Sequence, residues 1–122
     1  MSKDASSQSA AQVRIVVAED EALIRMDLIE MLQEAGYSVV AEATNGAEAI
    51  ELVQEHQPDL VILDVKMPVL DGISAAKKII SIAPVLMLTA FSQRELVERA
   101  RDAGVMAYVV KPFTIGDLVP AI

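Results

Sequence analysis

The sequence predicts an α/β fold in which a parallel sheet of five strands is covered by helices on both faces. Short β-branched segments alternate with segments whose apolar residues recur at helical spacing. This alternation favours a parallel sheet, because each strand returns across a helix before the next one pairs. The chain has 122 residues, 53% of them hydrophobic, and no cysteine. It can therefore bury one core without disulfides.

The first half of the chain contains two strand patterns, each followed by a helix pattern. RIVVAE at 14–19 is a β-branched run that predicts a strand. Residues 22–35 carry apolar side chains at helical spacing, and Gly36 is suited to cap the end of that helix. YSVVAEA at 37–43 predicts a second strand. The helix expected over 45–56 begins at an asparagine, a preferred N-cap residue.

The next segments include the two most apolar strands. DLVILD at 59–64 and VLMLTA at 85–90 are continuous apolar runs, as expected of strands buried on both faces. A helix is expected between them, from Gly72 to about residue 80. SQRELVERARDAG at 92–104 opens with the capping-box spacing and closes on a glycine, so it predicts the fourth helix.

MAYVV at 106–110 predicts the fifth strand, and a fifth helix is expected to begin at Thr114. Right-handed crossovers leave few ways to wind five such units, and we expect the flavodoxin-like strand order 2-1-3-4-5. This order buries the apolar strands at 59–64 and 85–90 in the centre. It leaves the more polar strand at 37–43 on an edge.

The chain is interpreted as one domain over residues 13–122, preceded by a flexible polar tail over 1–12. The last helix has only about two turns and contains Pro120, so we expect the protein to continue beyond Ile122. A formal charge of −8 argues against direct nucleic-acid binding by this chain. Neither a signal peptide nor a membrane-spanning run is recognisable, which favours a cytoplasmic protein.

Polar side chains gather where the predicted strands end. The first strand leads to Glu19 and Asp20, the third to Asp64, the fourth to Thr89 and the fifth to Lys111. Ligands of open α/β sheets bind at this edge. Grouped carboxylates suit Mg²⁺, while a lysine and a hydroxyl can bind a phosphoryl group. Asp64 is then the candidate nucleophile, which would form an acyl phosphate.

Each of these residues also has an ordinary structural explanation. Charged groups are common where strands leave a core, and Thr89 or Lys111 alone would be taken for a turn or surface residue. Their coincidence at four strand ends, at the switch point of the strand order, favours a functional site.

Four ordered motifs, VVAEDE, VILDVKMPVLDG, LTA and YVVKPF, resemble the receiver domain of bacterial two-component response regulators. The resemblance implies that Asp64 accepts a phosphoryl group from a sensor histidine kinase. It implies an acidic pocket of Glu19 and Asp20, with Mg²⁺ bound there by Asp20, Asp64 and the backbone carbonyl of Lys66. Many members have aspartate where Glu19 stands. Such a domain catalyses only its own phosphorylation and dephosphorylation, and is not otherwise an enzyme.

The resemblance also implies a switch. Thr89 and Lys111 would contact the phosphoryl group, and Tyr108 would move inward to alter the face made by helix 4, strand 5 and helix 5. Pro68 lies in the loop that contributes the carbonyl for the metal, and the Lys111–Pro112 peptide is expected to be cis. A mixed-charge row on the fourth helix is the candidate partner surface. It comprises Arg94, Glu95, Glu98, Arg99, Arg101 and Asp102.

EDEALIRMDL, FSQRELVERARDAG and VVKPFTIGDLVPAI are especially similar to receivers of the ANTAR class. In that class a C-terminal helical domain binds RNA and regulates transcription antitermination. The resemblance therefore implies an RNA-binding output domain as a partner, and a homodimer is possible.

Three alternatives remain open. The first is a pseudo-receiver, an interaction domain without phosphorylation. The second is a phosphatase with an aspartate nucleophile, although that class needs a second aspartate where Lys66 stands. The third is a flavodoxin-like nucleotide-binding protein, but no glycine-rich phosphate loop occurs.

Overall fold

The computed structural model describes residues 12–89, 98–99, 101–111 and 115–122. Several predictions therefore fall outside the described residues. They are the N-terminal tail up to residue 11, the first part of the helix at 92–104, the Lys111–Pro112 peptide and the Thr114 cap. Within that helix, residues 98–99 and 101–102 are helical.

The sheet has the predicted five parallel strands in the order β2-β1-β3-β4-β5. Each strand lies within one residue of its predicted bounds. The strands are β1 (Arg14–Ala18), β2 (Ser38–Ala43), β3 (Leu60–Asp64), β4 (Val85–Thr89) and β5 (Ala107–Val110).

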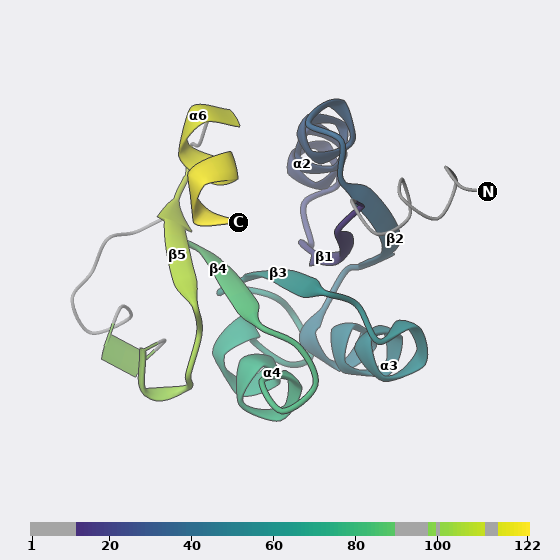
Figure 1. The fold of residues 1–122 in the computed structure, drawn as a ribbon. Coiled ribbons are helices and arrows are strands. Elements are labelled where there is room, and N and C mark those ends of the chain that lie inside the picture. Colours follow the sequence, from purple (N-terminus) through teal and green to yellow (C-terminus); the bar gives the residue numbers. More distant parts are fainter. Residues whose placement is uncertain (1–11, 90–97, 100, 112–114) are drawn as a thin grey trace.

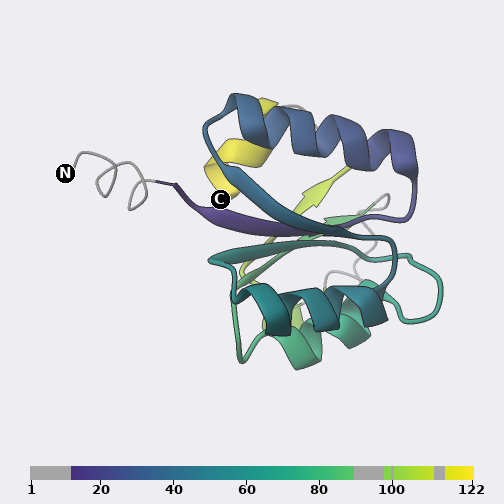
Figure 2. The ribbon, with the colours of Figure 1, turned by 90° about the vertical axis from the view of Figure 1, so that its right-hand side faces the viewer.

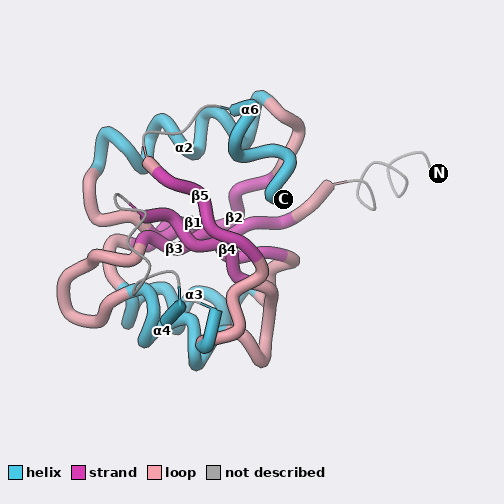
Figure 3. The backbone as a smooth tube through the Cα atoms, turned by 90° about the vertical axis from the view of Figure 1, so that its left-hand side faces the viewer, coloured by secondary structure: helices cyan, strands magenta, loops and turns pink. Residues whose placement is uncertain are grey.

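The described helices form two layers around this sheet (Figure 1). They are α2 (Ala22–Glu34), α3 (Gly46–His56), α4 (Gly72–Ile79) and α6 (Ile115–Leu118), followed by the 3-10 helix η1 (Val119–Ala121). Helices α2 and α6 cover one face, whereas α3 and α4 cover the other (Figures 2 and 3). Pro120 lies in η1, where the α-helix has given way to a 3-10 turn. None of the described helices is long and apolar enough to cross a membrane.

Strand β3 explains how an apolar run becomes buried on both faces. Val61 and Leu63 belong to the core beneath α3 and α4, while Leu60 and Ile62 belong to the core beneath α2 and α6. Every residue of β3 and of β4 is buried. The two central strands therefore hold their carboxyl ends rigidly, because side chains pack against them from both layers.

The predicted cap of α2 is confirmed as a Schellman motif. Gly36 has a φ of 96°, and its N–H donates to the carbonyl of Gln33 at 3.1 Å. The N–H of Tyr37 donates to the carbonyl of Leu32 at 3.0 Å. The predicted N-cap of α3 is also present, since Asn45 Oδ1 accepts from the N–H of Glu48 at 2.8 Å.

Candidate functional site

The predicted site residues meet at the carboxyl edge of the sheet. Glu19, Asp64 and Thr89 are the buried polar or charged residues within the described parts of the chain, with exposures of 0%, 5% and 4%. Parallel pairing aligns Asp64 with Leu88, so the end of β3 lies beside the end of β4. Groups from strands far apart in the sequence thus share one small volume, as the strand-end argument predicted.

Lys111 connects two of these carboxylates. Its Nζ lies 2.5 Å from Glu19 Oε1 and 3.2 Å from Asp64 Oδ1. Its backbone N–H donates to the carbonyl of Thr89 at 2.7 Å, which extends the pairing of β4 with β5. The lysine side chain is only 12% exposed, so it is a bridging cation within the site and not a solvated surface lysine.

The pKa values reflect this crowding. Burial raises the pKa of Asp64 from 3.8 to about 6, Glu19 adds to the rise, and Lys111 opposes it. Burial alone would lower the pKa of Lys111, but the hydrogen bond to Glu19 and the charges of Asp64 and Glu19 raise it overall. Asp64 is therefore ionised at neutral pH, but its anion is destabilised. A cation bound nearby, or a covalent bond to one of its oxygens, would relieve this destabilisation.

An acidic cluster lies at the mouth of the site. Oxygen atoms of Glu19, Asp20 and Glu21 lie within 4.8 Å of one another. Glu21 is not among the predicted site residues, although it follows directly in the AEDE motif. Both carboxylate oxygens of Glu19 are already engaged, because Oε2 accepts the N–H of Glu21 at 3.0 Å. Asp20, by contrast, is exposed.

The loop at 65–71 is held between the starts of two helices. The N–H of Gly46 donates to the carbonyl of Leu70 at 2.9 Å, and the N–H of Gly72 donates to the carbonyl of Val65 at 2.9 Å. A Cβ on Gly46 would lie 2.3 Å from the Leu70 oxygen, and one on Gly72 would lie 2.0 Å from the oxygen of Asp64. Both positions therefore need glycine because the backbones approach too closely for any side chain.

The same loop contains a strained turn. Val69 has a φ of 68°, unusual for a β-branched residue, and the N–H of Leu70 donates to the carbonyl of Pro68 at 2.7 Å. Asp71 then caps α4, accepting from the N–H of Ser74 at 2.8 Å. The loop and the start of α2 lie at the same end of the sheet (Figure 2).

A cleft of about 500 Å³ lies beside the acidic cluster. Its lining residues are Asp20, Val65, Lys66, Met67, Pro68, Asp71, Ile73 and Arg99. Lys66 and Pro68, both predicted to belong to the metal-binding loop, therefore border the same cleft as Asp20.

Of the residues predicted for the switch and the partner surface, Thr89 belongs to the buried site and Arg99 lines the cleft, whereas Tyr108 is in neither set. Tyr108 on β5 is 46% exposed, whereas Thr89 is buried. Among the residues of the mixed-charge row, Glu98, Arg99, Arg101 and Asp102 are described and exposed. Arg94 and Glu95 lie outside the described residues.

The strand order and this carboxylate–lysine group at its switch point define the class of CheY-like receiver domains. The family model described as response regulator receiver domain matches residues 15–122. The chain belongs to this family.

Comparison with known proteins gives the same result. The chain is 65% identical over 118 residues to the transcriptional regulatory protein PdtaR of Mycobacterium tuberculosis. The matched region covers 95% of this chain but only 58% of the length of PdtaR. It is 43% identical to the chemotaxis protein CheY of Bacillus subtilis, covering 89% of this chain and 93% of that one. The signal receiver domain of NarL from Mycobacterium tuberculosis has a similar structure, with a TM-score of 0.86, 33% identity and coverage of 90% and 92%.

Proposed function

We propose that this receiver domain accepts a phosphoryl group on Asp64 from a phosphohistidine of a sensor kinase, in the cytoplasm. The single observation that carries the proposal is the environment of the Asp64 carboxylate. It is buried at the end of a rigid strand, lies 3.2 Å from Lys111 Nζ, and has its pKa raised to about 6. It is a fixed anion beside a cation, as a nucleophile for phosphoryl transfer must be.

In the proposed reaction an oxygen of Asp64 attacks phosphorus while the phosphorus–nitrogen bond of the phosphohistidine breaks. The imidazole nitrogen keeps the bonding electron pair and takes up a proton from solvent. The product is an acyl phosphate on Asp64. Lys111, already 3.2 Å from this carboxylate, would pair with a phosphoryl oxygen, and Thr89 would donate its hydroxyl to another.

The chemistry of the donor set fits Mg²⁺, because the site offers carboxylate and carbonyl oxygens, and the carboxylates of Glu19, Asp20 and Glu21 gather beside it. Asp20, Asp64 and the backbone carbonyl of Lys66 would hold the ion. When bound, it supplies positive charge that neutralises the phosphoryl oxygens. Glu19 would belong to the acidic pocket mainly by orienting Lys111, since both of its oxygens have partners within the protein.

We further propose that Asp64 phosphorylation draws Thr89 toward the phosphoryl group and lets Tyr108 turn inward. Tyr108 is half exposed in this structure, so an inward position would be a measurable change. Beryllofluoride, which imitates a phosphoryl group on a carboxylate, should shift and broaden the ring resonances of Tyr108 in NMR spectra. Unchanged Tyr108 resonances alongside shifted Thr89 resonances would contradict this switch.

The output is proposed to be an RNA-binding domain of the ANTAR type. The support is the similarity to PdtaR, whose name describes a transcriptional regulatory protein and whose length extends well beyond the matched region. The full-length regulator should bind RNA with an affinity that depends on acetyl phosphate. Equal RNA affinity with and without acetyl phosphate would contradict this part of the proposal.

Incubation with acetyl phosphate and Mg²⁺, followed by intact mass measurement, tests the phosphoacceptor. We expect one added phosphoryl group in the wild-type chain and none in Asp64→Asn. The control Asp27→Asn removes an exposed carboxylate from α2 and should be phosphorylated normally. An unmodified wild-type chain would favour a pseudo-receiver instead.

A further inference from the structure

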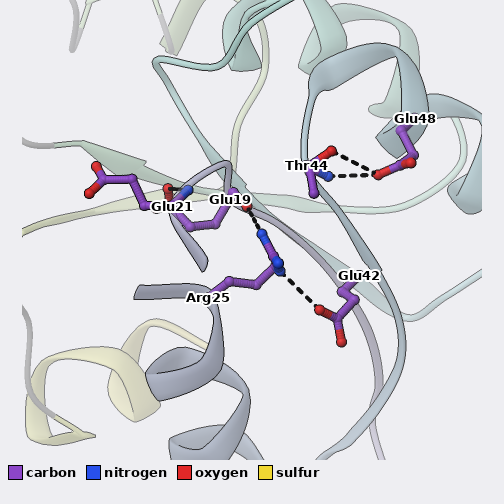
Figure 4. A network of polar contacts seen from close by, with 6 residues as sticks. All are labelled: Glu19, Glu21, Arg25, Glu42, Thr44 and Glu48. Carbon is purple, nitrogen blue, oxygen red and sulfur yellow. Dashed lines mark hydrogen bonds and ion pairs between the residues drawn. The ribbon is translucent and has the colours of Figure 1, made fainter. Parts of the chain in front are cut away.

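Arg25, on the first turns of α2, makes two contacts that reach outside its own helix. Its Nε donates to Glu42 Oε1 on strand β2 at 2.9 Å, and its Nη1 donates to the backbone carbonyl of Glu19 at 2.8 Å (Figure 4). The Arg25 side chain is only 15% exposed, whereas that of Glu42 is 54% exposed. The guanidinium therefore links the exposed Glu42 carboxylate on the edge strand to the backbone carbonyl of Glu19, beside the acidic cluster.

The backbone that Arg25 contacts carries the acidic side chains. The N–H of Glu19 donates to the carbonyl of Ala43 at 3.1 Å, and the carbonyl of Glu19 accepts from Arg25. The peptide group that joins Glu19 to Asp20 is thus tied at its oxygen, and the preceding one at its nitrogen. These two hydrogen bonds restrict the orientation of the peptide group from which the Asp20 residue continues.

The connection between β1 and α2 is short, and its backbone orientation decides where its acidic side chains point. Only three residues, Glu19 to Glu21, separate the end of the strand from the start of the helix. All three are acidic, so they repel one another when no metal ion is bound, although Lys111 partly offsets the charge of Glu19. Without a donor on the Glu19 carbonyl, rotation of the Glu19–Asp20 peptide would change the direction of the Asp20 side chain.

We infer that Arg25 is a positioning residue for the cation site, holding the Glu19–Asp20 peptide in the orientation that lets Asp20 bind Mg²⁺. This inference rests on the proposed function, because it takes Asp20 to be a ligand of the proposed Mg²⁺ site. It also gives Glu42 a role, since this carboxylate aims the guanidinium from the edge strand β2. Outer groups that orient metal ligands typically change metal affinity 10- to 100-fold when removed.

The sign of the effect separates positioning from simple electrostatics. Arg25 is a positive charge close to a proposed cation site, so its removal should strengthen Mg²⁺ binding if only charge matters. If Arg25 acts by positioning, its removal should weaken Mg²⁺ binding in spite of the lost repulsion. If Arg25 contributes only to folding, its removal should lower the free energy of unfolding and leave the Mg²⁺ affinity of the folded chain unchanged.

Calorimetric titration of the metal-free full chain with Mg²⁺ tests the inference without any activity measurement. We expect Arg25→Ala to weaken Mg²⁺ binding by roughly tenfold or more. Arg25→Lys keeps the charge but lacks the fork that spans both acceptors, so its affinity should be intermediate. If Arg25→Ala does not fold, the Mg²⁺ affinity of Arg25→Lys still tests the inference. Denaturant unfolding of each variant gives the accompanying change in stability.

Arg14→Ala is the matched control. Like Arg25, Arg14 donates from Nη1 to a backbone carbonyl, that of Gln57 at 3.2 Å, but it lies on β1, at the end of the strand away from Glu19. Its loss should lower the unfolding midpoint and leave Mg²⁺ affinity unchanged. Wild-type affinity in both Arg25 variants, or tighter binding in Arg25→Ala, would overturn the inference alone. A wild-type chain that binds no Mg²⁺ would overturn the proposed metal site as well.

Discussion

Replacing Asp64 by asparagine should stabilise the metal-free domain at neutral pH. The Asp64 carboxylate is buried beside Glu19, and both effects make its anion less stable in the folded chain than in water. Asparagine keeps the size and removes the charge. Lys111 retains a partner after the substitution, because Glu19 Oε1 lies 2.5 Å from its Nζ.

The pKa of Asp64 gives the expected size of this gain in the free energy of unfolding. A rise from 3.8 to about 6 means that the folded chain holds this proton more tightly than the unfolded chain. The associated stability is present below the unfolded pKa and is lost as the pH rises through 6. At about 1.4 kcal/mol for each pH unit, the loss is at most roughly 3 kcal/mol. The attraction of Lys111 for the anion is already included in this shift, and we expect Asp64→Asn to raise the free energy of unfolding by about 1–3 kcal/mol.

Urea unfolding followed by circular dichroism, with a chelator present, measures this difference. Asp64→Asn should have the higher free energy of unfolding at about pH 7.5, and its advantage should nearly vanish at about pH 4. The control Asp27→Asn should show little difference at either pH. An Asp64→Asn variant that is less stable than wild type at neutral pH, or whose advantage does not depend on pH, would contradict a destabilised Asp64 anion.

Three further substitutions test other parts of the structure by the same unfolding measurement. Gly72→Ala should destabilise by about 1–3 kcal/mol or more, because the added Cβ meets the backbone oxygen of Asp64; near-wild-type stability would contradict that close approach. Lys111→Met should cost roughly 3–5 kcal/mol at neutral pH, because the fully buried Glu19 loses its cation. Stability close to that of the wild type would argue against this cause. Asn45→Ala should cost about 1 kcal/mol through the lost helix cap, and no loss would mean that water replaces it.

The strand order and strand bounds could be predicted because they follow from local patterns. A change between two periodicities marks each element, and the handedness of crossovers restricts the winding. The meeting of Asp64 with Lys111 could be predicted for the same reason, since both stand where parallel strands end. Their separation in sequence does not matter once the strand order is known.

The contacts that orient these groups could not be predicted in this way. Arg25 reads as one more polar position on an amphipathic helix, and its two acceptors are known only when β2 lies beside β1. Gly46 and Gly72 read as helix starts, yet their close approach to the loop at 65–71 depends on how α3 and α4 pack. Side-chain geometry of this kind follows from tertiary structure, which no single segment encodes.

The most direct test of the proposed function locates the phosphoryl group itself. After reaction with acetyl phosphate and Mg²⁺, borohydride should reduce an acyl phosphate and convert the modified aspartate to homoserine. Peptide mass mapping should then find homoserine at position 64 and aspartate at positions 20, 59 and 71. Homoserine at another position, or at none, would contradict Asp64 as the phosphoacceptor.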